Sequence, residues 1–240
     1  MALAEARARA VTADPRLIVA LDLASRPEAE AVVDRLGDAV SFYKVGLQLL
    51  AVGGMETARQ LKRSGLSVFL DWKLHDIGAT VEKATAAIAA AEAGDFITVH
   101  AEPQVLAAAV KGRGGAPLKI LGVTVMTSLT SEDLTEIGYG FPVEALVERR
   151  VRQVLDAGAD GVIVSPREAA LARRIGGPGL LVVTPGVRPA WASRDDQARA
   201  ATPAHTLSEG ASHIVCGRPI TAAADPRAAA LRIAEEMAGA

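Results

Sequence analysis

Residues 67–80 have the sequence SVFLDWKLHDIGAT, in which a short apolar run ends in charged residues and leads into a segment of small residues. Short β-branched and aliphatic runs of this kind are typical of buried strands. Seven other such runs occur, and together they predict eight strands, at residues 17–22, 41–46, 67–73, 96–100, 119–126, 161–165, 180–186 and 213–217. Strands without polar alternation favour a parallel sheet that is covered by helices.

Helical segments separate most of the predicted strands. We expect helices at residues 27–36, 53–64, 79–93, 103–110, 143–157 and 226–237, and a short capped helix at TSEDL (130–134). This alternation predicts an α/β fold, a single (β/α)8 TIM barrel over residues 1–240 with an N-terminal extension at 1–15. An open doubly wound sheet is the alternative, but no Gly-x-Gly-x-x-Gly follows the first strand.

The composition narrows the classes of function. Half of the 240 residues are apolar and the formal charge is −2, so we expect no basic surface for nucleic acid. The longest apolar runs are far shorter than the roughly 20 residues of a membrane-spanning helix, and residues 1–16 lack the apolar core of a signal peptide. The single cysteine, Cys216, cannot form an internal disulfide, which fits a reducing compartment and predicts the cytoplasm.

Charged side chains gather where the first three predicted strands end, which is the active-site end of a barrel of this type. These residues are Asp22, Lys44, Asp71, Lys73, His75 and Asp76. Charges beside apolar strands are costly unless they are paired, so we expect an alternating Asp and Lys network that needs neither metal nor cofactor. Residues 71 and 73 project to the same side of a regular strand, although a simple rim ion pair is the alternative for an isolated Asp-x-Lys.

A second group of residues follows the last two predicted strands. Glycine lets the backbone approach a phosphate closely, and a guanidinium can bind two phosphate oxygens at once. Barrels of this class often bind phosphate at this corner. We therefore expect a phosphate site formed by Gly186, Arg188, Gly217 and Arg218.

The segment DWKLHDIGAT (71–80) resembles the signature of the orotidine 5′-phosphate decarboxylase family, whose core is Asp-x-Lys-x-x-Asp-Ile followed by a threonine. The resemblance extends over nearly the whole barrel, through VALD (19–22), KVG (44–46), VTVMTS (123–128), VTPGVRP (183–189), DQ (196–197) and GRPI (217–220). It implies a homodimeric enzyme that converts orotidine monophosphate to UMP and CO2 in pyrimidine biosynthesis, without a metal or a cofactor.

The resemblance also implies roles for single residues. Lys73 is the proton donor to C6 of the pyrimidine, Asp71 lies beside the departing carboxylate, and Lys44 and Asp76 complete the catalytic network. The substrate-binding set is Asp22 and Lys44 at the ribose, Thr127 and Ser128 at the base, Gln197 between base and phosphate, and Arg188, Gly217 and Arg218 at the phosphate. Asp76 and Thr80 reach into the neighbouring subunit's site, and residues 187–197 form a lid.

The chain departs from the family pattern in three places. Gly78 and Ala79 stand where the family often has Pro-Asn, so one polar contact is in question. Asp195 replaces a more usual glycine, and Ala-Glu-Pro follows His100 in place of a glycine-rich turn. His100 either lines the site or packs as a structural residue, and the sequence leaves both open.

Two alternative functions are weighed against this one. Magnesium-dependent sugar-phosphate decarboxylases and aldolases of the same superfamily share Asp-x-Lys-x-x-Asp but have an acidic residue in the second strand. Lys44 occupies that region here, and a cation there opposes a divalent metal. A catalytically inactive barrel with a binding role is the second alternative, and the presence of every expected reactive residue disfavours it.

Overall fold

The computed structural model describes residues 13–192 and 201–239, and within them eight parallel strands close into a barrel. The strands are β1 (Leu17–Ala20), β2 (Phe42–Gly46), β3 (Ser67–Leu74), β4 (Phe96–His100), β5 (Lys119–Val123), β6 (Gly161–Ile163), β7 (Leu181–Thr184) and β8 (His213–Cys216). Each strand pairs with the next, and β8 closes the barrel by pairing with β1. The predicted (β/α)8 barrel is confirmed.

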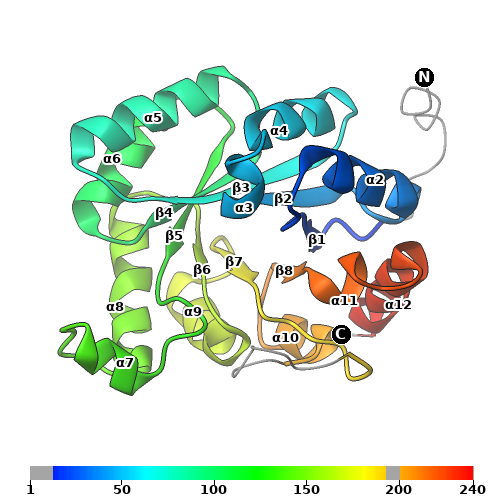
Figure 1. The fold of residues 1–240 in the computed structure, drawn as a ribbon. Helices are drawn as coiled ribbons and strands as arrows, with labels where there is room; N and C mark the ends of the chain where they lie inside the picture. The colour runs from blue at the N-terminus through cyan, green and yellow to red at the C-terminus, as the bar shows by residue number, and fades with distance from the viewer. Residues whose placement is uncertain (1–12, 193–200, 240) are drawn as a thin grey trace.

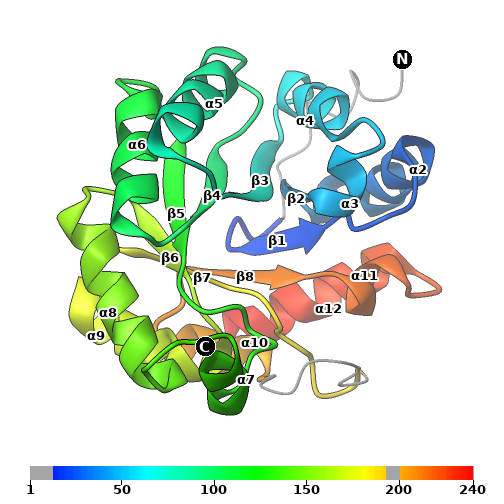
Figure 2. The ribbon, with the colours of Figure 1, turned by 60° about the vertical axis from the view of Figure 1, so that its left-hand side comes forward.

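Helices surround the strands on the outside of the barrel (Figures 1 and 2). The longer ones are α2 (Arg26–Leu36), α4 (Gly54–Arg63), α5 (Gly78–Ala90), α6 (Pro103–Arg113), α8 (Val143–Asp156), α9 (Ala169–Gly176) and α12 (Pro226–Ala238). The shorter ones are η2 (Gly37–Ala39), α3 (Leu47–Leu50), α7 (Ser131–Glu136), η3 (Pro166–Glu168), α10 (Pro203–Ser208) and α11 (Arg218–Thr221). None of the helices in the described ranges is long and apolar enough to cross a membrane.

Alternate strand residues fill two separate apolar cores. One core lies inside the barrel and contains Ile18, Phe42, Phe69 and Phe96, whereas residues such as Leu17 face the helices. The Phe42 and Phe69 rings meet the Phe96 ring edge-on, with centroids 5.0 and 6.1 Å apart. Phe69 also lines the cavity described below, so this aromatic cluster closes the barrel beneath it.

The predicted boundaries differ from the structure in two respects. β1, β5, β6 and β7 end two or three residues before the apolar runs do. The loops that follow are themselves buried, as Thr124 and Val125 are after β5, so residue type alone does not mark the end of a strand. The predicted helices also omitted α9 and α10, which have only eight and six residues.

Candidate active site

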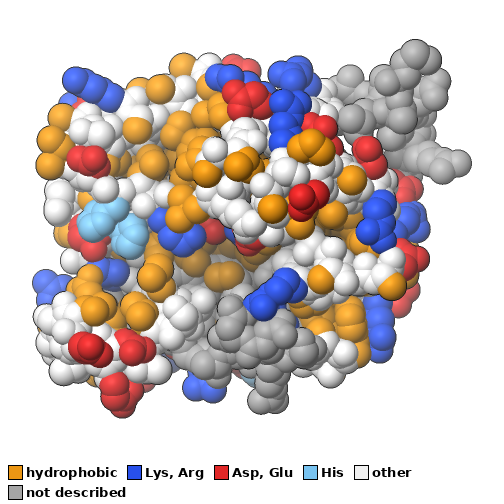
Figure 3. Space-filling view, viewed as in Figure 1, with side chains coloured by type: hydrophobic (Ala, Val, Ile, Leu, Met, Phe, Trp, Pro, Cys, Tyr) orange, Lys and Arg blue, Asp and Glu red, His pale blue; other side chains and the backbone are white. Residues whose placement is uncertain are grey.

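A cavity of about 580 Å³ opens at the carboxyl ends of the strands. In Figure 3 this face of the molecule is hollowed at its centre, with apolar side chains inside the hollow and charged ones at its edge. The lining includes these residues predicted for the site: Asp22, Lys44, Asp71, Lys73, Thr127, Ser128, Gly186, Arg188, Gly217 and Arg218. The barrel thus brings together residues that are almost 200 positions apart in the sequence, from Asp22 to Arg218.

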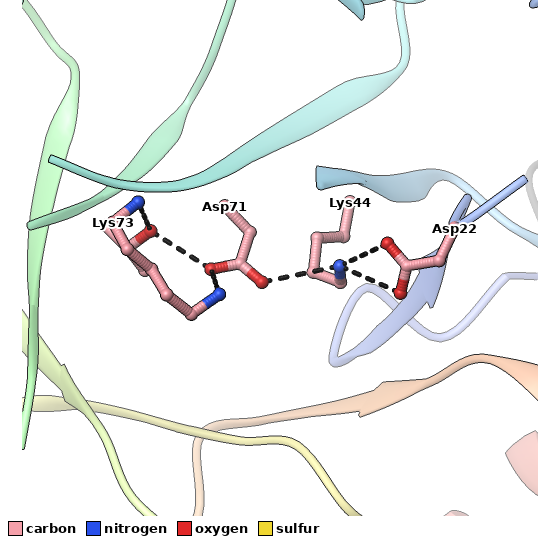
Figure 4. Close-up of polar contacts among 5 residues, drawn as sticks. Asp22, Lys44, Asp71 and Lys73 are labelled. Atoms are coloured by element: carbon pink, nitrogen blue, oxygen red, sulfur yellow. Dashed lines mark hydrogen bonds and ion pairs between the residues drawn. The ribbon is translucent and has the colours of Figure 1, made fainter. Parts of the chain in front are cut away.

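Asp22, Lys44, Asp71 and Lys73 form a row of alternating charges across the cavity, as Figure 4 shows. Lys44 Nζ lies 2.9 Å from Asp22 Oδ1 and 3.3 Å from Asp71 Oδ2, and Lys73 Nζ lies 2.8 Å from Asp71 Oδ1. The side chains of Lys44 and Asp71 are 9% and 15% exposed, against 28% for Lys73 and 50% for Asp22. The inner pair is therefore shielded, and the two outer groups are open to a ligand.

The inner pair remains ionised because each charge has opposite charges beside it. Burial alone would lower the pKa of Lys44, but the carboxylates of Asp71 and Asp22 outweigh it, and this pKa is raised. Burial alone would raise the pKa of Asp71, but Lys44 and Lys73 outweigh it, and this pKa is lowered. At neutral pH the site thus holds fixed charges of both signs without a bound ion.

Lys73 does not continue β3 as a regular strand residue, contrary to the expectation for residues 71 and 73. Its φ is 48°, in the left-handed region, and the pairing of β3 with β4 shifts register between Leu70 and Leu74. Both side chains still line the cavity, because this bulge redirects Lys73 toward Asp71. A non-glycine residue in this conformation is strained, and such strain is often found at functional sites.

Thr98 holds the bulge in place, and sequence reasoning missed it. Its hydroxyl accepts a hydrogen bond from the Lys73 main-chain N–H (2.9 Å) and donates one to Asp71 Oδ1 (3.0 Å). Thr98 is fully buried on β4. The available signal was its position as a polar residue inside the apolar run FITVH (96–100), which is costly unless the hydroxyl is paired.

Gly46 is a second residue whose role only the structure shows. A Cβ atom at this position would lie 2.4 Å from Asp22 Oδ1 and 2.8 Å from Lys44 Nζ. Contacts this short require the charged groups to move. The glycine of the KVG segment (44–46) therefore makes room for the ion pair beside it.

The residues predicted to bind phosphate follow β7 and β8 and line the same cavity. Arg188 is 8% exposed, and its Nε has no hydrogen-bond partner among the described residues, while Nη1 donates to the Val187 carbonyl (3.1 Å). A buried donor without a partner is destabilising, and an anion in the cavity would satisfy it. Gly186 has φ 79°, a conformation that favours glycine, at the start of this segment.

The comparisons with known proteins agree with this geometry. The family model described as "Orotidine 5'-phosphate decarboxylase / HUMPS family" matches residues 15–233. The chain belongs to this family. A relative from Caulobacter sp. (strain K31), named orotidine 5′-phosphate decarboxylase, is 66% identical over 95% of this chain and 100% of its own length.

Other members of the family agree in sequence and in fold. A relative of the same name from Methylobacterium radiotolerans is 53% identical over 94% of this chain and 98% of its own. The crystal structure of orotidine 5′-phosphate decarboxylase from Lactobacillus acidophilus superposes with a TM-score of 0.81 and 36% identity. That superposition covers 93% of this chain and 99% of the other, so the similarity to the family spans the whole barrel.

Two residues that the family resemblance assigned to the site do not line this cavity, and a third is not among the described residues. Asp76 and Thr80 are exposed and do not line it, and Asp76 Oδ1 accepts a hydrogen bond from the Ile77 N–H (2.6 Å). Residues 193–197 of the predicted lid at 187–197 lie outside the described residues, and they include Asp195 and Gln197. Asp76 is thus separate from the Asp22 to Lys73 row within one subunit.

The remaining histidines and the cysteine lie apart from the cavity lining. His100 stacks on His75 with ring centroids 4.6 Å apart, and burial lowers its pKa. His213 packs edge-on against Phe42 and Phe96 at the opposite end of the barrel, and burial lowers its pKa to about 4. Cys216 is fully buried, which raises its pKa to about 12, so its thiol is not activated.

No three His, Cys, Asp or Glu side chains within residues 13–192 and 201–239 form a group that could hold a metal ion.

Proposed function

We propose that this chain converts orotidine 5′-phosphate to UMP and CO2 in pyrimidine biosynthesis, the reaction for which its relatives are named. The observation that carries the proposal is the Lys44–Asp71–Lys73 row in a cavity that also contains Arg188 and Arg218. The row supplies charges for the reacting carbon, and the arginines supply a site for the phosphate.

The reaction breaks the bond between C6 and the carboxylate carbon, and the electron pair stays on C6 as CO2 leaves. No adjacent carbonyl delocalises this pair, so a fixed positive charge aimed at C6 lowers the barrier. The Lys73 ammonium supplies that charge and then its proton to C6, which gives UMP and a neutral amine that water reprotonates. Asp71 Oδ1, 2.8 Å from Lys73 Nζ, holds the ammonium in place before the substrate binds.

Substrate binding divides between the two ends of the cavity. Arg188, Gly217 and Arg218 bind the phosphate, while Asp22 and Lys44 contact the ribose. Thr127 and Ser128 lie over the base. The family resemblance assigns Gln197, which is outside the described residues, to the link between base and phosphate. Binding energy gained at the phosphate, far from C6, serves to fix the pyrimidine against Lys73.

The magnesium-dependent sugar-phosphate reaction gains no support from these observations. Lys44 Nζ lies between Asp22 and Asp71, the two carboxylates nearest to it, at 2.9 and 3.3 Å. A divalent cation that bound both would have to displace this ammonium. The reaction proposed here uses the Lys44 and Lys73 ammonium groups at the reacting carbon and requires no metal ion.

The experiment that tests the activity follows the loss of orotidine 5′-phosphate absorbance with EDTA present, and identifies the product by chromatography. We expect UMP to form at the same rate with and without the chelator. Loss of activity in EDTA that added magnesium restores would contradict the proposal and favour the sugar-phosphate enzymes.

We further propose that the chain forms a homodimer in which Asp76 and Thr80 contribute to the partner's site. Both are exposed and lie outside the cavity of their own subunit. Large apolar side chains are exposed on nearby elements: Leu47 by 56%, Val52 by 47% and Ile77 by 71%. Exposed apolar side chains gathered in one region mark an interface.

Mixing two inactive variants tests the shared site. Lys73→Ala and Asp76→Ala are purified separately, mixed and allowed to exchange subunits. If Asp76 acts across the interface, one site of each mixed dimer is intact, and the mixture has activity that neither variant shows alone. A mixture that exchanges subunits and remains inactive would show that Asp76 acts within its own subunit.

We place the reaction in the cytoplasm, since a single cysteine fits a reducing compartment.

A further inference from the structure

Arg150 is a buried cation on α8 that does not line the cavity. Its Nη2 donates to Glu102 Oε1 (2.8 Å) and to the Tyr139 hydroxyl (3.0 Å), and its Nη1 donates to the main-chain carbonyl of Thr124. A planar guanidinium suits acceptors in several fixed directions, which an ammonium would not. Arg150 thereby ties α8 to the end of β4, the end of β5 and the connection between α7 and α8.

The contact with Thr124 bears directly on the active site. Thr124 is the first residue after β5, and the next four residues, 125–128, all line the cavity. Its hydroxyl donates to the Ile163 carbonyl on β6 (2.7 Å), so the main chain at Thr124 is fixed from two sides. The direction in which Thr127 and Ser128 leave the barrel therefore depends on Arg150.

The contact with Glu102 also links Arg150 to the segment that follows β3. Glu102 Oε2 lies 3.7 Å from His75 Nε2, and the His75 ring stacks on His100. His75 follows Lys73 by two residues in the chain. Glu102 belongs to the Ala-Glu-Pro segment (101–103) that follows His100.

We propose that Arg150, held by Glu102 and Tyr139, is a positioning residue that sets how Thr127 and Ser128 recognise the pyrimidine base. The inference rests on the proposed function, in which these two residues lie over the base. Arg150 touches no substrate atom and acts through the carbonyl of Thr124. Its loss leaves the phosphate corner, built from β7 and β8, in place.

The test compares Arg150→Met with Arg149→Met, the same change at the adjacent, exposed arginine that packs on Phe141. Inhibition constants are measured for UMP, CMP and ribose 5-phosphate. UMP and CMP differ only at the base amide edge, and ribose 5-phosphate has no base. We expect Arg150→Met to reduce the preference for UMP over CMP by about tenfold, which corresponds to about 1.4 kcal/mol. Binding of ribose 5-phosphate, and all three constants in Arg149→Met, should be unchanged.

An unchanged UMP-to-CMP ratio in Arg150→Met would overturn the proposal. Equal weakening of UMP, CMP and ribose 5-phosphate would also overturn it, because it would show a general disturbance of the cavity. If Arg150→Met does not fold, Tyr139→Phe removes one hydrogen-bond partner of Arg150 and Glu102→Gln removes the charge of another. Each should reduce the ratio in the same direction by a smaller factor.

Decarboxylation by the wild type separates this proposal from the proposed function. If the wild type forms UMP but Arg150→Met keeps the wild-type preference for UMP over CMP, only the positioning role of Arg150 is contradicted. A wild type that neither forms UMP nor prefers UMP to CMP contradicts the proposed function, and the positioning role with it.

Discussion

The two ends of the cavity differ in whether their charged side chains find partners within the protein. At the reacting end, Lys44, Asp71 and Lys73 pair with one another, and Thr98 anchors them to β4. At the phosphate end, the buried Arg188 keeps one nitrogen without a partner among the described residues. One end is organised before substrate arrives, whereas under the proposed function the other is completed by the substrate phosphate. Changes at the first should therefore affect the chemical step, and changes at the second should affect binding.

The largest effect is expected at the centre of the organised end. Asp71→Ala leaves the Lys44 and Lys73 ammonium groups without their shared partner, so Lys73 loses its position and mutual repulsion increases. We expect kcat to fall by about 10³-fold and the free energy of unfolding by about 3 kcal/mol. Steady-state kinetics and urea unfolding measure the two quantities. A variant with unaltered kcat would show that the row is structural only.

At the phosphate end we expect a smaller loss of activity, which should come from weaker substrate binding and not from a slower chemical step. Arg218→Ala removes a charge-assisted contact to the phosphate, which should raise KM and lower kcat/KM by about 10²-fold while leaving the fold intact. Orotidine, which lacks the phosphate, serves as the control substrate. Its slow turnover should be the same in both proteins. Unchanged kinetics with orotidine 5′-phosphate would remove the phosphate assignment.

Thr98→Val tests whether the bulge contributes to the organised end. Valine has nearly the same shape but cannot accept from the Lys73 N–H or donate to Asp71 Oδ1. The loss of two buried hydrogen bonds should lower kcat by about tenfold at nearly constant KM. The matched control is Thr85→Val. Thr85 is also a fully buried threonine, but it lies on α5, and this variant should keep wild-type kcat. Equal losses in both variants would show that Thr98 has no special role.

Much of the fold and of the organised end could be predicted from the sequence. The eight strands were found because each is an apolar run, and Asp22, Lys44, Asp71 and Lys73 were found because charges at strand ends are conspicuous. Thr98 was missed because a single threonine in a strand has the same residue type whether its hydroxyl is structural or positions a catalytic group. The left-handed conformation of Lys73 was missed because lysine gives no sign of positive φ. In the proposed homodimer the site to which Asp76 and Thr80 contribute belongs to a second subunit, which one chain does not contain.

The opposite end of the barrel should influence stability and not catalysis. Burial among aromatic rings lowers the pKa of His213 to about 4, below its usual value of 6.5. The unfolded chain therefore binds a proton that the folded protein does not, and the free energy of unfolding falls as the pH decreases from about 6.5 to about 4. His213→Gln should flatten this part of the stability profile in urea unfolding at several pH values, with kcat/KM unchanged. A variant that keeps the wild-type slope would show that His213 does not titrate as its burial indicates.

The most direct test of the account is Lys73→Ala, assayed for decarboxylation and for UMP binding on the same preparation. Lys73 is the only group in the row proposed to deliver a proton to C6, so turnover should fall to the detection limit. UMP should still bind, since the phosphate and base contacts lie on other elements. Substantial decarboxylation by Lys73→Ala would contradict the central claim, because another group would then have to stabilise and protonate C6.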